Sequence, residues 1–222
     1  MVTADEQRAG RGRQGRTWSA PAGGALLYSV ILRPLEERHL LLPLAVPLAV
    51  CEAVEGISSH QCQVKWPNDV WINGRKCAGV LIEARPQDGW AVIGVGLNIS
   101  IEPGDFPEEL RDSAISVGGE ATVAEALGFL NSTLAGWTQA EPEQVLAAFR
   151  DRDALLGREI GWTSAAVGTE RAAAGVAEHA GAATGSGVAE GIDERGNLIV
   201  ATDGGERASL GSGEVHLRRV KR

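Results

Sequence analysis

Hydrophobic and polar residues alternate along the first half of the chain in a way that predicts β-strands. Five segments carry this pattern, namely 25–33, 61–66, 70–72, 75–84 and 90–100. Asn73-Gly74 separates two of these segments, and such a dipeptide is a strong signal for a tight hairpin. A turn over 86–89 separates the last two segments. We therefore expect the five segments to form one sheet.

Helical spacing covers three other segments, 36–57, 122–139 and 142–156. Pro43 and Pro47 disfavour helix at the start of the first segment, so its onset is expected later than the pattern suggests. Thr122 and Glu141-Pro142 are N-terminal signals for the other two. The expected fold class is α/β (α+β), a mixed β-sheet with helices on one side.

The composition changes at Gly157, after which Gly, Ala, Val and Thr dominate and turn signals fall at 193–196 and 203–205. This change predicts two domains, 1–156 and a small β domain over 157–222. Segment 163–187 is rich in Ala and Gly and has little periodicity, so we expect it to include a mobile loop.

Length and charge restrict the class of protein. The 222 residues are 44% hydrophobic and can bury one sizeable core with a small appendage, and the formal net charge is -8. The longest apolar run, 40–51, is too short to span a bilayer, and no signal-peptide pattern is visible. Cys51, Cys62 and Cys77 have no metal-ligand spacing, which favours a reducing cytoplasm.

Segment 5–18 combines four arginines with three glycines, Gly10, Gly12 and Gly15, in an acidic chain. Such a loop suits an anion, because glycines let backbone N–H groups face a ligand and guanidinium groups bind its oxygens. A solvated basic loop is the plainer interpretation. The glycines match G-x-G-x-x-G, but a dinucleotide fold needs a strand before them and a helix after them. Nucleic-acid binding is disfavoured, since the pI is about 5.1.

Strand 75–84 places Lys76 on one face with Ala78 and Val80, and Gly79 on the other face. Lys76 either extends outward to solvent or reaches into a site where an anion balances its charge. Glycine weakens a strand unless something approaches the backbone closely, so Gly79 favours a site.

Strand 90–100 has one face of aliphatic residues and one nearly bare face. The bare face carries Gly94 and Gly96 at alternate positions and ends at Asn98. A planar ring can lie on such a strip, with the amide of Asn98 paired to its edge. Close packing of another segment on the glycines explains the pattern equally well.

Turn 65–69 adds the amide of Asn68 and the carboxylate of Asp69 beside the strand that carries Lys76. Asp69 either orients Lys76 or binds Mg²⁺. Trp18, after the arginine loop, is either a core anchor or a lid over an aromatic ligand. A phosphate-binding loop, a groove for a ring, a lysine and a carboxylate together indicate ATP-dependent acyl activation without a Walker motif.

The chain resembles the biotin protein ligases. The resemblance covers nearly the whole chain and rests on four stretches: DEQRAGRGRQGRTW, KWPNDVWINGRKCAGVLIEA, VIGVGLNIS, and a terminal module with GIDERGNLIV and GSGEVHLR. It implies that biotin and ATP, with Mg²⁺, form biotinyl-5′-adenylate and pyrophosphate. The biotinyl group then passes to one lysine of a biotin carboxyl carrier protein domain of acetyl-CoA or another acyl-CoA carboxylase.

The resemblance also implies roles for individual residues, with Lys76 and Arg13 as the catalytic pair. Asp69 is the candidate metal ligand. The implied biotin-binding residues are Gln7, Arg11, Gly12, Arg13, Lys76 and Gly79. The implied nucleotide-binding residues are Trp18, Asn68, Asp69, Gly94, Gly96 and Asn98.

The resemblance further implies that domain 157–222 is an SH3-like β-barrel. Members of the family carry upstream strands and a helix that contacts biotin, so the N-terminal part is expected to be missing here. No DNA-binding domain, nucleic acid or membrane partner is expected, and a homodimer stays open. The alternatives are a lipoate or octanoyl transferase and a non-catalytic biotin- or nucleotide-binding protein.

Overall fold

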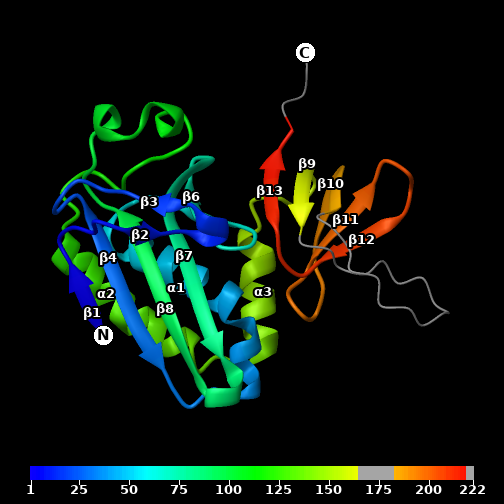
Figure 1. Cartoon of the computed structure of the whole chain (residues 1–222), viewed down its shortest axis with the longest axis horizontal. Coiled ribbons are helices and arrows are strands. Elements are labelled where there is room, and N and C mark those ends of the chain that lie inside the picture. The colour runs from blue at the N-terminus through cyan, green and yellow to red at the C-terminus, as the bar shows by residue number, and fades with distance from the viewer. Residues whose placement is uncertain (165–182, 219–222) are drawn as a thin grey trace. The chain divides into compact units, whose positions relative to one another are not determined.

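The computed structural model describes residues 1–164 and 183–218, which form two compact units, Met1–Ala154 and Leu155–Arg222. The boundary expected after residue 156 lies close to this division. Unit 1 is built on a six-stranded sheet (Figure 1). In spatial order its strands are β1 (Val2–Ala4), β4 (Ala25–Leu32), β8 (Trp90–Asn98), β7 (Arg75–Arg85), β6 (Asp69–Ile72) and β5 (Cys62–Lys65).

Neighbouring strands of this sheet are all antiparallel. Parallel pairing in the described residues is restricted to two isolated bridges, Val64 with Asp153 and Lys76 with Ala114. The expected mixture of parallel and antiparallel pairs is therefore limited to these bridges. Short connections explain the antiparallel pairs β5–β6, β6–β7 and β7–β8, because parallel neighbours need a crossover of about a dozen residues or more.

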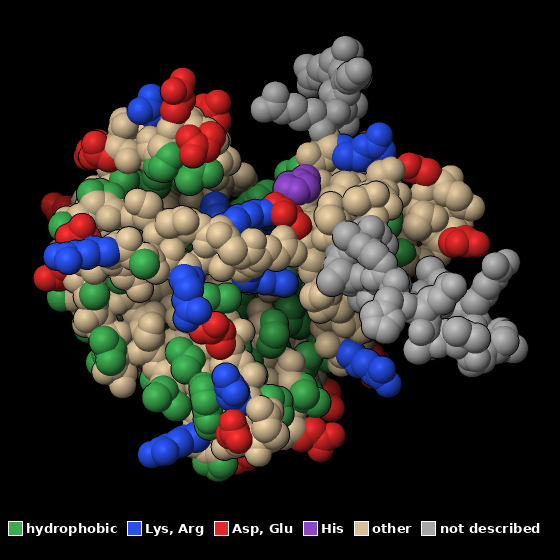
Figure 2. All heavy atoms as spheres, in the orientation of Figure 1, with side chains coloured by type: hydrophobic (Ala, Val, Ile, Leu, Met, Phe, Trp, Pro, Cys, Tyr) green, Lys and Arg blue, Asp and Glu red, His purple; other side chains and the backbone are tan. Residues whose placement is uncertain are grey.

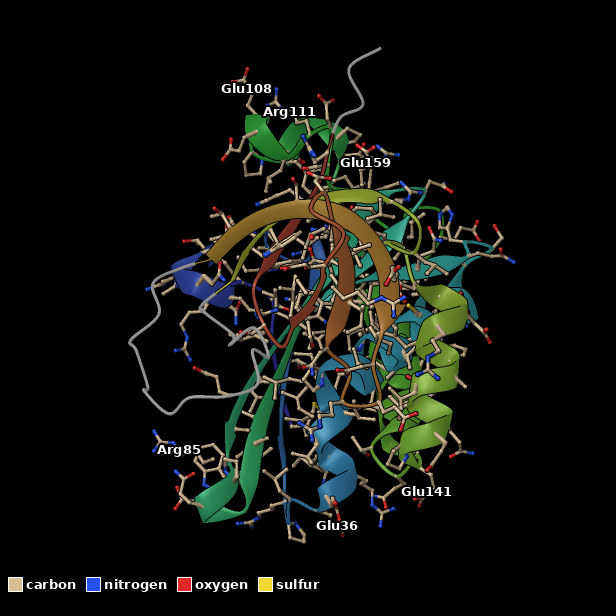
Figure 3. All side chains as sticks on the ribbon, turned by 90° about the vertical axis from the view of Figure 1, so that its right-hand side faces the viewer. Glu36, Arg85, Glu108, Arg111, Glu141 and Glu159 are labelled. Carbon is tan, nitrogen blue, oxygen red and sulfur yellow. The ribbon has the colours of Figure 1, made fainter. Side chains whose placement is uncertain are left out.

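Helices cover one face of the sheet. They are α1 (Leu42–Ile57), α2 (Val123–Trp137) and α3 (Pro142–Arg152). Seen from the side they lie together on one side of the strands, and Glu36 and Glu141 lie at the same end (Figure 3). Arg38 joins these two carboxylates, at 2.7 Å from Glu36 and 3.6 Å from Glu141. The other face of the sheet is left to the loops that precede and follow the strands.

The helix expected over 36–57 begins later, as Pro43 indicated, but the expectation for Pro47 was wrong, because this residue lies inside the helix. Glu37–Leu41 is a 3-10 turn, and the α-helix starts at Leu42 with Pro43 in its first turn, where its missing N–H costs nothing. Glu37–Ile57 is long and apolar enough to cross a membrane by length and composition alone, but 67% of its apolar 18-residue window is buried inside the structure. Its apolar character is accounted for by packing in the core. The helix expected over 142–156 ends early, at Arg152.

Loop 5–18 is a small hairpin, with β2 (Gly10–Arg11) paired to β3 (Thr17–Trp18) around a 3-10 turn at Arg13–Gly15. A side chain at Gly10 would fall on the carbonyl oxygen of Trp18, so only glycine fits there. A short strand, β1, precedes the loop and pairs with β4. The dinucleotide arrangement stays excluded, because a hairpin and not a helix follows the glycines.

Unit 2 is an antiparallel sheet of β12 (Arg207–Leu210), β11 (Leu198–Thr202), β10 (Ala183–Ile192), β9 (Glu159–Ser164) and β13 (Glu214–Leu217), in that order. Within residues 155–164 and 183–218 no pairing joins β12 to β13, so the closed barrel is not confirmed. Segment 163–187, expected to include a mobile loop, begins in β9 and ends in β10. Its middle lies outside the described residues.

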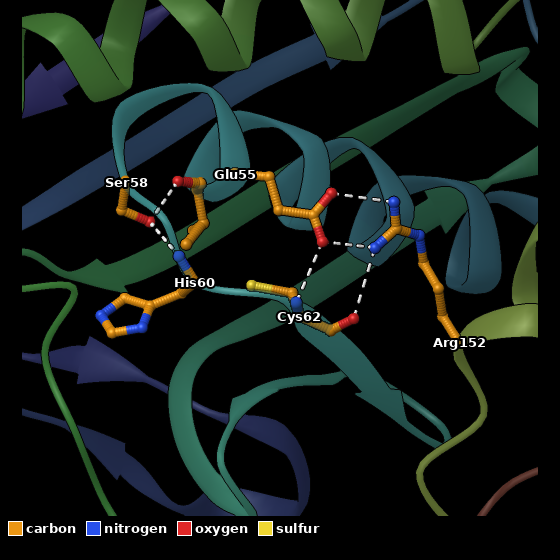
Figure 4. Close-up of polar contacts among 6 residues, drawn as sticks. Glu55, Ser58, His60, Cys62 and Arg152 are labelled. Carbon is orange, nitrogen blue, oxygen red and sulfur yellow. Dashed lines mark hydrogen bonds and ion pairs between the residues drawn. The ribbon is translucent and has the colours of Figure 1, made fainter.

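A half-buried ion pair ties the end of α1 to α3 and β5 (Figure 4). Arg152 binds both carboxylate oxygens of Glu55, at 2.5 and 2.9 Å, and also donates to the carbonyl of Cys62. The backbone N–H of Cys62 donates to Glu55. Cys51, Cys62 and Cys77 are all free and buried, and the pKa of the Cys51 and Cys77 thiols is raised by interaction with the thiol of Cys62 and by burial.

Candidate active site

The candidate site lies on the face of the sheet that the helices leave open. Paired residues point to the same side of a sheet, so the register groups side chains across strands. One such row runs from Leu27 through Gly96 and Gly79 to Asp69 and Lys65. The row therefore has an apolar end on β4, a bare middle on β8 and β7, and a charged end on β6 and β5. Hydrophobic, basic and acidic side chains alternate over this side of the molecule (Figure 2).

A β-bulge brings Lys76 to the same face as this row. Between β6 and β7 the register shifts, so that Trp71 pairs with Lys76 but Val70 pairs with Ala78. Cys77 is the extra residue, and it turns into the core. The predicted face of Lys76 was therefore wrong: its Nζ lies 3.1 Å from the position that a Cβ on Gly79 would take. Strict alternation cannot detect a bulge, because the pattern of residue types does not show which residue is unpaired.

Asp69 fixes the ammonium group of Lys76. The Nζ–Oδ1 distance is 2.6 Å, and the side chain of Asp69 is only 16% exposed. The N–H and carbonyl of Lys76 are also bound, to Ser113 and Ile115 of the segment that follows β8. The bulged strand, the neighbouring strand and this segment thus hold Lys76 from three sides. Of the two roles predicted for Asp69, the geometry supports the orientation of Lys76.

Arg13 from the hairpin contributes a second cation. Its Nη1 donates to Oδ1 of Asn68 at 3.3 Å, and the amide of Asn68 donates to the carbonyl of Val80 at 2.8 Å. Burial lowers the pKa of Arg13, while the charge of Asp69 acts to raise it. Asn68 therefore connects the arginine loop to β7, the strand that carries Gly79.

The bare middle of the row, Gly96 on β8 and Gly79 on β7, is the glycine strip. The side chain of Trp18 covers it. A Cβ on Gly96 would overlap the indole, and a Cβ on Gly79 would lie 3.2 Å from it. Lys76 Nζ lies 5.8 Å from the centre of the ring, within the range of a cation–π contact. The indole also packs on an apolar cluster of Ala25, Leu27, Ile101 and Phe106. Of the two interpretations of the glycine pattern, the structure shows the close packing of another segment, here the indole of Trp18. The binding of a ligand ring stays a prediction.

The N–H of this indole is buried and has no hydrogen-bond partner within residues 1–164 and 183–218. Leaving such a donor unpaired costs about 1–3 kcal/mol. Trp18 is therefore packed on the strip but not locked there by a polar contact. This combination suits a side chain that moves when another ring enters the groove.

Asn98 is more deeply placed than its predicted role requires. Its side chain is 4% exposed, and its amide donates to the carbonyl of Ile115 at 3.2 Å. The backbone carbonyl of Asn98 accepts from the backbone N–H of Val117. Asn98 holds the segment after β8 against the strip, and its predicted contact with a base stays a prediction.

The remaining predicted residues surround this centre more loosely. Arg11 is exposed and paired to Glu83 of β7 at 2.9 Å, Gln7 is exposed beside Gly10, and Gly94 lies next to the backbone of Leu81. Gly12 bonds to Arg16 and closes the hairpin turn. Lys65, to which the sequence analysis assigned no role, lies 4.0 Å from the second oxygen of Asp69. Its signal in the sequence was its place one strand away from Asp69.

The residues present do not fit a resident Mg²⁺ ion. Protein-held Mg²⁺ takes oxygen ligands in octahedral geometry, whereas Asp69 is surrounded by Lys76, Lys65 and Arg13. Within the described ranges no group of three metal-ligating side chains is present. The role of Asp69 as a metal ligand therefore finds no support in this geometry.

Comparison with known proteins gives the arrangement a family. The model described as the biotin/lipoate A/B protein ligase family matches residues 1–100, and the model of the biotin protein ligase C terminal domain matches residues 181–218. A biotin–[acetyl-CoA-carboxylase] ligase of Mycobacterium tuberculosis is 31% identical over 98% of this chain and 79% of its own length. The chain belongs to the biotin protein ligase family.

Other biotin protein ligases match in part or in fold. The bifunctional ligase/repressor BirA of Bacillus subtilis is 40% identical over 54% of this chain, and the match spans 39% of that relative's length. The structure of a biotin protein ligase from Aquifex aeolicus in complex with biotin and ATP aligns with a TM-score of 0.74 at 28% identity. That alignment covers 98% of this chain and 88% of the other.

Proposed function

We propose that this chain is an ATP-dependent biotin protein ligase. It forms biotinyl-5′-adenylate and transfers biotin to a lysine of a biotin carboxyl carrier protein domain of acetyl-CoA carboxylase. The observation that carries this proposal is the Lys76–Asp69 pair, with its Nζ–Oδ1 distance of 2.6 Å, at the charged end of the glycine strip and beside Arg13. The name of the M. tuberculosis relative and the ligands of the A. aeolicus structure support the choice of substrates.

In the first step a carboxylate oxygen of biotin attacks the α-phosphorus of ATP. The new O–P bond forms as the bond to the β-phosphate oxygen breaks, and pyrophosphate leaves with the electron pair. Both reactants are anions, so their approach is opposed by charge repulsion. Lys76, held in place by Asp69, offsets this repulsion and the charge that develops on the α-phosphate oxygens.

In the second step the amine of the carrier lysine attacks the acyl carbon of the adenylate. The amide bond forms, the bond to the phosphate oxygen breaks, and AMP leaves while the amine loses a proton. Arg13 faces the charge of the departing phosphate from the hairpin. Its hydrogen bond to Asn68 holds it within the groove, where burial strengthens its contact with an anion.

The remaining assignments belong to the same proposal. Gln7, Arg11, Gly12 and Gly79 bind biotin with Arg13 and Lys76. Trp18, Asn68, Asp69, Gly94, Gly96 and Asn98 form the nucleotide side. We place the protein in the cytoplasm, which agrees with three free thiols. The proposal is compatible with a monomer and with a homodimer.

Pyrophosphate release tests the proposal. The ligase releases pyrophosphate only when biotin and ATP are both present, and the acid-quenched reaction contains biotinyl-5′-adenylate by mass spectrometry. A carrier domain added later gains one biotinyl group. Lipoate in place of biotin serves as the matched control, because the first family model covers both classes. Release with lipoate and not biotin, or no release with either, would overturn the proposal in favour of a lipoate enzyme or a non-catalytic binder.

A further inference from the structure

Lys65 is placed to act on a ligand at the same site. It is the last residue of β5 and the cross-strand partner of Asp69, so it continues the row that contains Gly79 and Gly96. Its side chain is only 16% exposed. Its Nζ lies over the ring of Trp71, 5.5 Å from the ring centre, a cation–π contact that places the ammonium group on this face of the sheet.

The ammonium group of Lys65 is only weakly held by the chain. An ammonium group carries three hydrogen-bond donors. In the part of the chain that the structure describes, its nearest carboxylate is that of Asp69, whose Oδ2 lies at 4.0 Å, beyond hydrogen-bond distance. The other oxygen of Asp69 is already bound to Lys76 at 2.6 Å. Lys65 therefore has donors that the described residues do not use.

Positive charge is in excess around Asp69. Lys76, Lys65 and Arg13 all act on this carboxylate, and no other carboxylate in the described ranges raises the pKa of Lys65 or Arg13. Burial lowers the pKa of Lys65, and the charges of Lys76 and Arg16 lower it further. A partly buried excess of cations is unfavourable without an anion to balance it. A ligand with several negative charges at this end of the row removes the imbalance.

We propose that Lys65 binds the β- and γ-phosphates of ATP and so stabilises the leaving pyrophosphate. This proposal rests on the proposed adenylation reaction. As the bond between the α-phosphorus and the bridging oxygen breaks, the electron pair stays on that oxygen and becomes part of pyrophosphate. Lys76 faces the α-phosphate, and Lys65, on the other side of Asp69, faces the group that leaves. No proton needs to move in this step.

Binding of ATP, AMP and inorganic pyrophosphate to the full chain, measured by calorimetry, tests the proposal. Lys65→Ala is expected to weaken ATP and pyrophosphate binding at least tenfold and to leave AMP binding within twofold. Lys65→Arg is expected to restore most of the loss, because a guanidinium group also binds phosphate. Gln63→Ala is the matched control, since Gln63 is exposed one row away on the same strand and face.

An equal loss of ATP and AMP binding in Lys65→Ala would overturn the proposal, because it would show a merely structural role. Unchanged pyrophosphate binding would overturn it as well. Lys65→Gln, which keeps a long polar stem, replaces the alanine variant if that variant unfolds. These affinities do not depend on biotin. A chain that binds pyrophosphate through Lys65 but releases none from biotin and ATP would refute the proposed function alone.

Discussion

Unit 1 contains two half-buried groups of charged residues, and they differ in the balance of positive and negative charge. Glu55 and Arg152, on the helix side of the sheet, balance one negative charge with one positive charge, and the backbone of Cys62 uses further donors and acceptors. Burial acts to raise the pKa of Glu55, but hydrogen bonds from Arg152 and Cys62 lower it overall. The bond to Glu55 raises the pKa of Arg152. Folding thus favours both charged forms.

The group around Asp69, on the open face, has more positive than negative charge. Burial lowers the pKa of Lys65 and of Arg13, so folding disfavours their charged forms. The difference shows what each group is for. A balanced pair stabilises the fold and has little left to offer a ligand, whereas an unbalanced one costs stability and attracts an anion.

Lys76→Ala is expected to have the largest effect on the unbalanced group. Loss of one preorganised charge lowers biotin- and ATP-dependent pyrophosphate release by about 10²-fold or more. Stability changes by less than about 1 kcal/mol, because Asp69 keeps Lys65 and Arg13 nearby. Stopped assays of pyrophosphate and thermal unfolding measure the two quantities. Release at the rate of the unchanged chain would remove Lys76 from the mechanism.

Arg152→Leu is expected to act in the opposite way. It leaves Glu55 half-buried without its partner and lowers the free energy of unfolding by about 1–3 kcal/mol. Pyrophosphate release per folded molecule stays unchanged. Denaturant unfolding measures the loss. The control is Arg207→Leu, which removes the partner of Glu190. The side chain of Arg207 is 76% exposed, so little change in stability is expected. A loss of activity larger than the loss of folded protein would show that the Glu55–Arg152 pair also serves the reaction, and not stability alone.

Gly96→Ala tests the ring that covers the unbalanced group. The added methyl overlaps the indole of Trp18, which must lift from the strip, at a cost of about 1–3 kcal/mol in stability. ATP binding weakens and tryptophan fluorescence changes. Gly128→Ala on α2 is the control, because no atom lies within 4 Å of its added methyl and alanine favours helix. Unchanged fluorescence and affinity in Gly96→Ala would mean that the strip carries no ring.

Lys65→Met is expected to have the smallest effect on stability and a distinct pH dependence. Burial lowers the pKa of Lys65 in the folded chain below the ordinary value for a lysine, so between the folded and the ordinary pKa the unfolded chain binds more protons. Stability therefore rises with pH across that window, and Lys65→Met flattens the rise. At neutral pH the variant is equally stable or about 1 kcal/mol more stable. Thermal unfolding from pH 7 to pH 11 measures this pH dependence. A clear loss of stability at pH 7 would refute the claim that positive charge is in excess around Asp69.

Strands, turns and caps of unit 1 could be predicted from local patterns. Asn73-Gly74 forms its hairpin turn, with Asn73 at φ 50° and Gly74 at φ 76°. Thr122 caps α2 by accepting from the N–H of Glu125. The helix start at Leu42 agrees with a local rule for Pro43, since proline is accepted in a first turn, but the same rule disfavours Pro47, which nevertheless lies inside the helix. Each of these depends on residues close together along the chain.

By itself the sequence determined five of the six strands of the sheet, all but β1, and also the glycine strip and the identity of the charged residues near it. It also carried the family, through motifs that lie in order along the chain. Only the tertiary structure decided that Cys77 is the bulged residue, which turns Lys76 toward Gly79, that Trp18 lies on Gly96, and that Lys65 belongs to the charge group of Asp69. The physical reason is that register, burial and charge balance depend on residues far apart in the chain, whose separation no local pattern contains.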